Sequence, residues 1–213
     1  MTHWVEGQAQ ARPHDDLGNH EAKGVRAFVA VRMNDQVEGS VAGAIDELKR
    51  PADGVRWVPR PNLHVTLKFL GPAVNSHRLQ QLTTGMRQLA ARTAPFEVAA
   101  AGIGAFPDLE HPRAIWVGLH NQQSGALAAL AARLEAVAAE NGFEREKQRW
   151  SGHLTIGRVG DRGISDATRD ALHAMRERQF GVSKIESITL YRSHLSPDGA
   201  SYEALATFLF QMH

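Results

Sequence analysis

The chain of 213 residues contains no cysteine. Disulfide bonds, thiolate nucleophiles and cysteine-ligated zinc are therefore excluded from any account of its stability or chemistry. It also has no apolar run approaching the roughly 18 to 20 residues that a membrane-spanning helix requires. The first 20 or so residues lack the apolar stretch of a secretory signal peptide. We therefore expect a cytoplasmic protein that does not act at a membrane.

An excess of charge of one sign is lacking too, because 24 Lys and Arg side chains face 23 Asp and Glu side chains. A chain close to neutral has no global attraction to nucleic acid, so any polyanion must bind at a local patch. The content of 43% hydrophobic residues is ordinary for a globular protein with a real core. Residues 1–24 are polar and without periodicity, which predicts a flexible leader before a single folded domain over 25–213.

The spacing of apolar residues indicates an alternation of short strands and single helices. It predicts helices over 36–50, 75–92, 125–142 and 165–178, and strands over 25–32, 55–58, 63–70, 95–105, 113–120, 153–158, 181–192 and 201–211. Gly71 and Pro72 are expected to end the third strand. This order favours antiparallel sheets with helices on their outer faces, an α+β fold. The series before and after residue 110 are similar, which suggests a duplicated unit and two related lobes.

Two of the predicted strands begin with nearly the same motif. The first reads His64-Val65-Thr66-Leu67 and the second reads His153-Leu154-Thr155-Ile156. Successive side chains of a strand point to opposite faces, so each motif places its histidine and threonine on one face and its two apolar residues on the other. The apolar faces can be buried. Each lobe can then present one imidazole and one hydroxyl to a shared groove.

Two histidines, one neutral and one protonated, can perform concerted acid and base catalysis near neutral pH, because the ordinary histidine pKa is about 6.5. Displacement at phosphorus suits such a pair, since the attacking and leaving oxygens lie on opposite sides. Thr66 and Thr155 would donate hydrogen bonds to the non-bridging oxygens. Arg158 is a candidate anion contact, because Gly157 permits a bulge or the end of the strand, and either would turn the arginine toward the phosphate.

Other interpretations stay open at this point. One His-x-Thr motif alone is weak evidence, because a histidine in a strand is more often half-buried than catalytic. Zinc or iron would need a third ligand, and neither motif carries a carboxylate within three residues. Further basic residues near the motifs could guide a nucleic-acid backbone or only solvate the surface: Arg56, Arg60, Lys68, Arg113 and Arg149.

The paired motifs resemble the 2H phosphoesterase superfamily, and within it the bacterial RNA 2′,3′-cyclic phosphodiesterases, also called 2′-5′ RNA ligases (LigT-like, ThpR). The resemblance covers about residues 25–211. It rests on the segments 55–59, 62–71, 104–107, 153–158 and 190–193, together with Gly199 and Tyr202, which stand in the family's order.

The resemblance implies a bilobal α+β fold with pseudo-two-fold symmetry, in which two antiparallel sheets face a central groove with helices on the outside. It implies hydrolysis of RNA 2′,3′-cyclic phosphate ends to 2′-phosphomonoesters, with His64 as proton donor and His153 as proton acceptor. Neither a metal nor another cofactor is expected. Ligation of 2′-5′-linked RNA would be the same reaction in reverse.

The expected protein is a monomer whose partner is RNA or an oligonucleotide with a 2′,3′-cyclic phosphate end. A small cyclic nucleotide such as ADP-ribose 1″,2″-cyclic phosphate is an alternative substrate. A nucleotide-binding module without turnover is an alternative function. The chain departs from the family in one place, because Gly152 stands where members usually have proline before the second histidine. Glycine frees the backbone, so His153 is expected to be less rigidly aimed.

Overall fold

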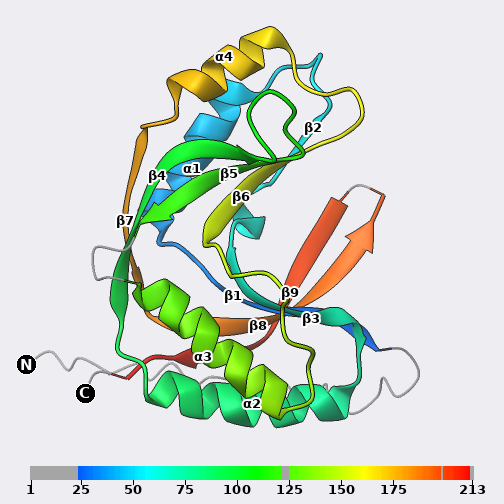
Figure 1. Ribbon diagram of the computed structural model, residues 1–213, viewed down its shortest axis with the longest axis vertical. Helices are drawn as coiled ribbons and strands as arrows, with labels where there is room; N and C mark the ends of the chain where they lie inside the picture. The colour runs from blue at the N-terminus through cyan, green and yellow to red at the C-terminus, as the bar shows by residue number, and fades with distance from the viewer. Residues whose placement is uncertain (1–23, 121–124, 198, 212–213) are drawn as a thin grey trace, which may run out of the picture.

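The computed structural model describes residues 24–120, 125–197 and 199–211. The leader expected over 1–24 therefore lies, apart from Gly24, outside the described residues. Two antiparallel sheets form the body of the protein, one above the other in Figure 1. The strand orders are β3-β1-β8-β9 in the four-stranded sheet and β2-β6-β5-β4-β7 in the five-stranded sheet. The expected α+β fold with two antiparallel sheets is confirmed.

The bounds of the elements follow the predicted alternation. The four-stranded sheet contains β3 (Val65–Val74), β1 (Val25–Val31), β8 (Ser187–Ser196) and β9 (Gly199–Leu209). The five-stranded sheet contains β2 (Val55–Trp57), β6 (His153–Val159), β5 (Ala114–His120), β4 (Phe96–Phe106) and β7 (Gln179–Ile185). The helices are α1 (Asp35–Leu48), α2 (Ser76–Ala91), α3 (Ala126–Glu140) and α4 (Asp166–Ala174), and a 3₁₀ turn, η2 (Arg60–Asn62), precedes β3.

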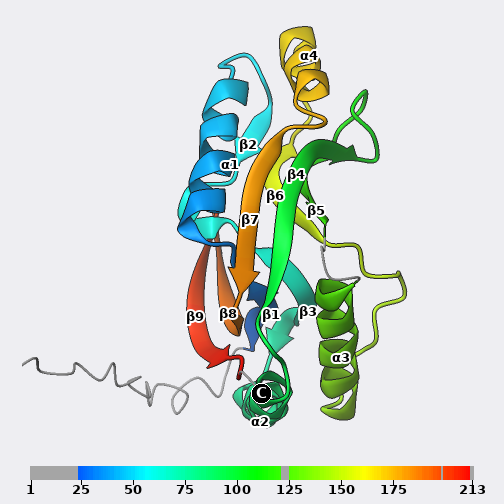
Figure 2. The same cartoon turned by 90° about the vertical axis from the view of Figure 1, so that its left-hand side faces the viewer.

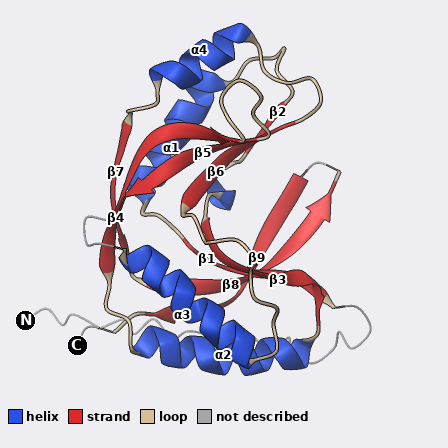
Figure 3. Cartoon of the chain, in the orientation of Figure 1, coloured by secondary structure: helices blue, strands red, loops and turns tan. Residues whose placement is uncertain are grey.

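Each sheet carries two helices. α2 and α3 pack together on the four-stranded sheet, whereas α1 and α4 pack on the five-stranded sheet, so α4 and α2 form the upper and lower ends of the molecule in Figure 3. Figure 2 shows α1 and α3 on opposite sides of the sheets. The apolar stripe predicted for α2 is its buried face, with Leu79, Leu82, Met86 and Leu89 against the core. No helix among the described residues is long and apolar enough to cross a membrane.

The similar series before and after residue 110 had suggested that each half of the sequence forms one lobe. The structure shows instead that each lobe contains elements from both halves. The first half gives β1, β3 and α2 to the lobe of the four-stranded sheet, but β2, β4 and α1 to the other lobe. The second half gives β5, β6, β7 and α4 to the lobe of the five-stranded sheet, but α3, β8 and β9 to the other. Each half therefore supplies one His-x-Thr strand, and neither half completes a sheet alone.

Two predicted strand bounds are wrong. The strand predicted over 181–192 is two strands, because β7 ends at Ile185 in one sheet and β8 begins at Ser187 in the other. Ile185 and Ile188 are both buried, so the apolar pattern continues across the crossing and conceals it. β3 also runs through Gly71 and Pro72 to Val74. It is an edge strand, and a proline there need not break a ladder hydrogen bond.

The buried carboxylate of Asp53 joins the loop after α1 to the start of α4. It accepts hydrogen bonds from the backbone N–H of Ser165 at 2.7 Å and from the hydroxyl of Thr168. Burial by itself raises the pKa of Asp53, but the hydrogen bonds from Thr168 and Ser165 outweigh it, and the pKa lies below its ordinary value. The ionised carboxylate is therefore the form that the fold stabilises.

Replacing this carboxylate should destabilise the fold in a pH-dependent way. Asp53→Ala should lower the free energy of unfolding by about 2 kcal/mol at pH 7, because the buried Thr168 hydroxyl and the partly buried Ser165 N–H lose a charged acceptor. The loss should shrink as pH falls through the depressed pKa of Asp53, since the contribution of this group is present only above it. Urea unfolding at pH 7 and at acidic pH measures both effects. Asp46→Ala is the control, because that carboxylate is 71% exposed in its ion pair with Lys49; equal losses for the two variants would contradict the argument.

Candidate active site

The two motif histidines come from different sheets and line one small pocket. His64 lies between η2 and β3 at the edge of the four-stranded sheet, and His153 begins β6 in the five-stranded sheet. The structure brings all five of the polar residues singled out from the sequence to this pocket of about 80 Å³. Its lining is Val58, Asn62, His64, Thr66, His153, Thr155, Arg158 and Tyr202.

The apolar partners of the motifs lie on the opposite strand faces. Val65 and Leu67 are 0% and 3% exposed, and Leu154 and Ile156 are both fully buried. The hydrophobic gain from burying these four side chains fixes which way each strand faces. The histidines and threonines then have no face left except the one toward the other sheet.

Each motif strand has a bulge directly after its threonine. Along β1 and β3, Ala30 pairs with Thr66 and Val29 with Lys68, so Leu67 is the extra residue. Along β5 and β6, Trp116 pairs with Thr155 and Ile115 with Gly157, so Ile156 is the extra residue. A bulge shifts the alternation of side chains by one position.

The bulge in β6 explains the place of Arg158. In a regular strand this residue would lie on the face opposite His153, but the extra Ile156 moves it to the same face, where it lines the pocket. The sequence predicted such a bulge at Gly157, and it lies one residue earlier. Arg56 is directly opposite Arg158 on β2, so two exposed guanidinium groups lie side by side on one face of the sheet.

The bulge in β3 has the opposite consequence for Lys68. This side chain points away from the groove and is 2% exposed, with its ammonium 3.0 Å from the carboxylate of Glu135. The prediction that Lys68 could guide a nucleic-acid backbone is therefore wrong. Phe69 takes the groove face after Thr66, and the Arg26 guanidinium lies 4.4 Å from the centre of its ring.

Both imidazoles are held by the same kind of hydrogen bond. Nδ1 of His64 lies 2.8 Å from the carbonyl oxygen of Asn62, and Nδ1 of His153 lies 2.9 Å from that of Ser151. A carbonyl only accepts, so Nδ1 carries a proton in each ring. Nε2 is consequently the atom of each ring that is left to accept or donate a proton.

The two imidazoles differ in their surroundings. The ring of His64 packs on Phe28, 4.8 Å between centroids, and perpendicular to Tyr202 at 4.9 Å. Burial lowers the pKa of His64; the hydrogen bond to the Asn62 carbonyl opposes this shift, and the positive charges of Arg32 and Arg158 add to it. In the free protein near pH 7, His64 is therefore neutral.

The surroundings of His153 come from other elements. Its ring lies 5.2 Å from that of Phe106, edge-on, and 6.4 Å from that of Trp116. Sequence reasoning gave no site role to Phe28, Trp116 or Asn62. Asn62 and Tyr202 did have a signal, because both stand among the residues that carry the family resemblance.

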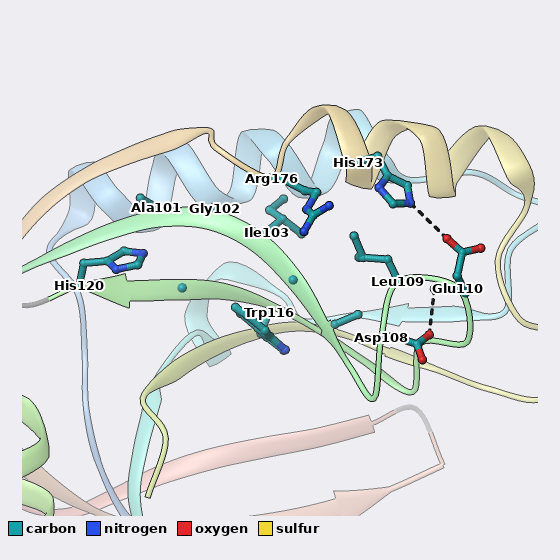
Figure 4. A pocket seen from close by; sticks show the side chains of 13 residues that line it. Ala101, Gly102, Ile103, Asp108, Leu109, Glu110, Trp116, His120, His173 and Arg176 are labelled. Carbon is teal, nitrogen blue, oxygen red and sulfur yellow. Dashed lines mark hydrogen bonds and ion pairs between the residues drawn. The ribbon is translucent and has the colours of Figure 1, made fainter.

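A larger pocket, of about 590 Å³, contains neither motif histidine. It lies between β4, β5 and α4, and Figure 4 shows His120 and His173 at its opposite ends. His173 does not face His120 as a partner; its Nε2 lies 3.4 Å from the carboxylate of Glu110. Volume alone is therefore a poor guide to the chemistry of this protein. No cluster of three or more His, Asp or Glu side chains in the described part of the chain has a spacing that could hold a metal ion.

Residues 37–196 match the model of a protein family described as the 2′-5′ RNA ligase superfamily. The chain belongs to this family. Two relatives named RNA 2′,3′-cyclic phosphodiesterase support the assignment. The protein from Archaeoglobus fulgidus is 32% identical, and the match covers 86% of this chain and 99% of the relative. The protein from Methanothermobacter thermautotrophicus is 30% identical, over 86% and 98%.

Two solved structures have a similar fold. The protein TT0787 of Thermus thermophilus matches with a TM-score of 0.74 and 26% identity, over 87% of this chain and 97% of that one. LigT of E. coli, solved in complex with 3′-AMP, matches with a TM-score of 0.68 and 22% identity, over 88% and 99%. The family model and the two relatives confirm the expected family membership, and these structures confirm the fold.

The difference in environment predicts a titration that NMR can measure. The imidazole of His64 should titrate below 6.5, the ordinary value, because burial disfavours its charged form. Inorganic phosphate in the pocket should raise the pKa of His64, since an adjacent anion stabilises the imidazolium. Carbon-13 and proton shifts of the ring, assigned with His64→Gln, report both. A pKa at or above 6.5 in the free protein would contradict the burial argument.

Proposed function

We propose that this protein hydrolyses RNA 2′,3′-cyclic phosphate ends to 2′-phosphomonoesters, with His64 and His153 as the acid and base. The observation that carries the proposal is that imidazoles from two sheets line one pocket, each with Nδ1 bound to a carbonyl and Nε2 left for proton transfer. The names of the relatives support the substrate class. The apposed rings support the type of reaction.

In the proposed reaction, Nε2 of His153 takes a proton from a water molecule, whose oxygen attacks phosphorus. The bond from phosphorus to O3′ breaks, and Nε2 of His64 gives a proton to that oxygen. The phosphate remains on O2′, and one water has been added across the broken bond. Thr66 and Thr155 donate hydrogen bonds to the non-bridging oxygens, and Arg158 balances their negative charge. Proton exchange with solvent restores the two histidines, and ligation of 2′-5′-linked RNA is the reverse reaction with a 5′-hydroxyl in place of water.

The role of His64 as the acid depends on the substrate. Burial and two neighbouring arginines keep the pKa of His64 low in the free protein. A bound phosphodiester supplies a negative charge and at the same time offsets the charge of Arg158, so both effects favour the imidazolium in the complex. The proton needed by the leaving oxygen is therefore acquired when the substrate binds.

Removal of either imidazole should abolish most of the turnover while leaving binding largely intact. His64→Ala and His153→Ala should each lower kcat on a 2′,3′-cyclic phosphate by about 10² to 10⁴-fold, the usual contribution of a proton-transfer group. Affinity for a 2′-nucleotide product should change little. His111→Ala, at a side chain 88% exposed on a loop, is the control.

The identity of the product is the second measurement on the same proteins. The wild type should release a 2′-phosphate, distinguished from a 3′-phosphate by phosphorus NMR, and EDTA should leave the rate unchanged. A 3′-phosphate product or undiminished turnover in the histidine variants would overturn the proposal. Loss of activity with EDTA would favour the metal alternative, and a wild type that binds nucleotides without turnover would favour a binding module.

A small cyclic nucleotide is the second candidate substrate, and a specific observation favours it. A pocket of about 210 Å³ adjoins the first and shares Asn62, His64 and Tyr202 with it, while Phe28 and Tyr191 provide aromatic walls. Structures of E. coli LigT with 3′-AMP, NADP⁺ and ATP support nucleotides of this size as ligands.

The two substrate classes differ in how they use the basic side chains that continue from the pocket, since Arg158 lines it and Arg56 lies next to Arg158 outside it. The neighbouring Arg56 and Arg158 favour an extended phosphate backbone. An oligonucleotide with a cyclic phosphate end should therefore have a kcat/KM about tenfold above that of a cyclic mononucleotide, and the difference should fall as salt rises. Parallel assays should include ADP-ribose 1″,2″-cyclic phosphate. Equal values for the mononucleotide and the oligonucleotide would favour the small-molecule alternative.

A further inference from the structure

The loop between α3 and β6 is fastened to the strand of the first motif. The ammonium of Lys68 donates to the backbone carbonyl of Glu144 at 2.6 Å. Glu135 on α3 receives this ammonium and also the backbone N–H of Glu146, the latter at 3.0 Å. Because Lys68 is 2% exposed, its contacts with the Glu144 carbonyl and with Glu135 are shielded from water. They hold the first part of the loop against β3.

Trp150 fastens the last part of the same loop. Its indole N–H donates to the carbonyl oxygen of Thr66 at 3.0 Å, so a residue just before the second motif is bonded to the threonine of the first. A few residues later the chain reaches His153, whose Nδ1 lies 2.9 Å from the carbonyl of Ser151. The Ser151 carbonyl is on the residue that directly follows Trp150.

We propose that Trp150 is a positioning residue, which holds the Ser151 carbonyl in place and so sets the orientation of the His153 ring relative to Thr66 and His64. It acts through the backbone and does not line the pocket. This inference rests on the proposed function, since it concerns the aim of the proton-accepting imidazole. The bond joins the loop before the second motif to the backbone of the first motif, in addition to the packing of the sheets.

Gly152 belongs to the same arrangement. A Cβ atom at this position would lie 2.6 Å from the ring of Trp150. The backbone itself does not require glycine here, because Gly152 is not among the residues with positive φ. The indole therefore occupies the space that a proline or any other side chain would need. The freedom expected of glycine before His153 is restricted by the tryptophan that packs over it.

The hydrogen bond can be removed while most of the ring is kept. Trp150→Phe should lower kcat about tenfold, because a small displacement of a proton-transfer group slows the chemical step steeply, and KM should stay within about twofold. Thr93→Val is the matched control. It removes a buried side-chain bond to a backbone carbonyl, that of Leu89 at the end of α2, far along the chain from either motif. Its kcat should be unchanged even where its loss of stability equals that of Trp150→Phe.

The packing of the Trp150 ring over Gly152 is tested with a double-mutant cycle. Gly152→Ala should lower kcat in the wild type, because the new methyl group displaces the indole. In a Trp150→Ala background the same change should have no further effect. Equal losses from Gly152→Ala in both backgrounds, or an unchanged kcat in Trp150→Phe, would overturn the proposal.

A measurement without substrate separates this inference from the proposed function. In Trp150→Phe the ring resonances of His153 should shift, and those of His64 should keep their position, when both are followed by NMR in the free protein. A wild type without turnover would refute the proposed reaction, and the His153 resonances would still decide the role of Trp150. Unshifted resonances would refute the inference even in an active enzyme.

Discussion

The extra residue directly after the threonine of each motif decides which of the following side chains face the groove. Leu67 and Ile156 are pressed into the core, 3% and 0% exposed, and each moves the alternation of its strand forward by one position. Without the bulge in β6, Arg158 would point into the hydrophobic interior, where an unpaired guanidinium is very costly. Without the bulge in β3, Lys68 would leave its carboxylate partner. The burial of Leu67 and Ile156 thus decides that Lys68 points into the core and that Arg158 points into the groove.

A His-x-Thr strand with a bulge occurs in both lobes, and the two histidines have the same backbone hydrogen bond. The aromatic side chains around the two histidines differ. Each imidazole has Nδ1 bound to the carbonyl two residues before it, which leaves Nε2 as the ring nitrogen that takes no part in this bond. The walls differ, because His64 is packed among Phe28, Tyr191 and Tyr202, whereas His153 lies against Phe106 and Trp116. Burial then lowers the pKa of His64. This shift comes from the surroundings of His64 and not from its sequence motif.

The sequence was a good guide wherever one strand or one helix decides the outcome. The alternation around His64 and His153 predicted which faces are buried, and the stripe of Leu79, Leu82 and Met86 predicted the buried face of α2. It failed where the chain passes from one sheet to the other while its pattern of apolar residues continues unchanged. Ile185 and Ile188 are buried in different sheets, yet they read as one continuous strand. Lys68 reads as a surface cation, because its carboxylate partner on α3 is remote in sequence.

The exchange of elements between the lobes limits how far the distance between His64 and His153 can vary. If each half of the chain folded into its own lobe, the groove would be a domain interface, and such interfaces commonly allow hinge motion. Here β4 leaves the first half to pair with β5, and β8 leaves the second half to pair with β1. A rigid-body opening of one lobe must therefore strain the short connections between the two sheets, such as the single residue between β7 and β8. Proton transfer needs donor and acceptor positions that hold to a fraction of an ångström, and an interleaved pair of sheets meets that need better than two tethered domains would.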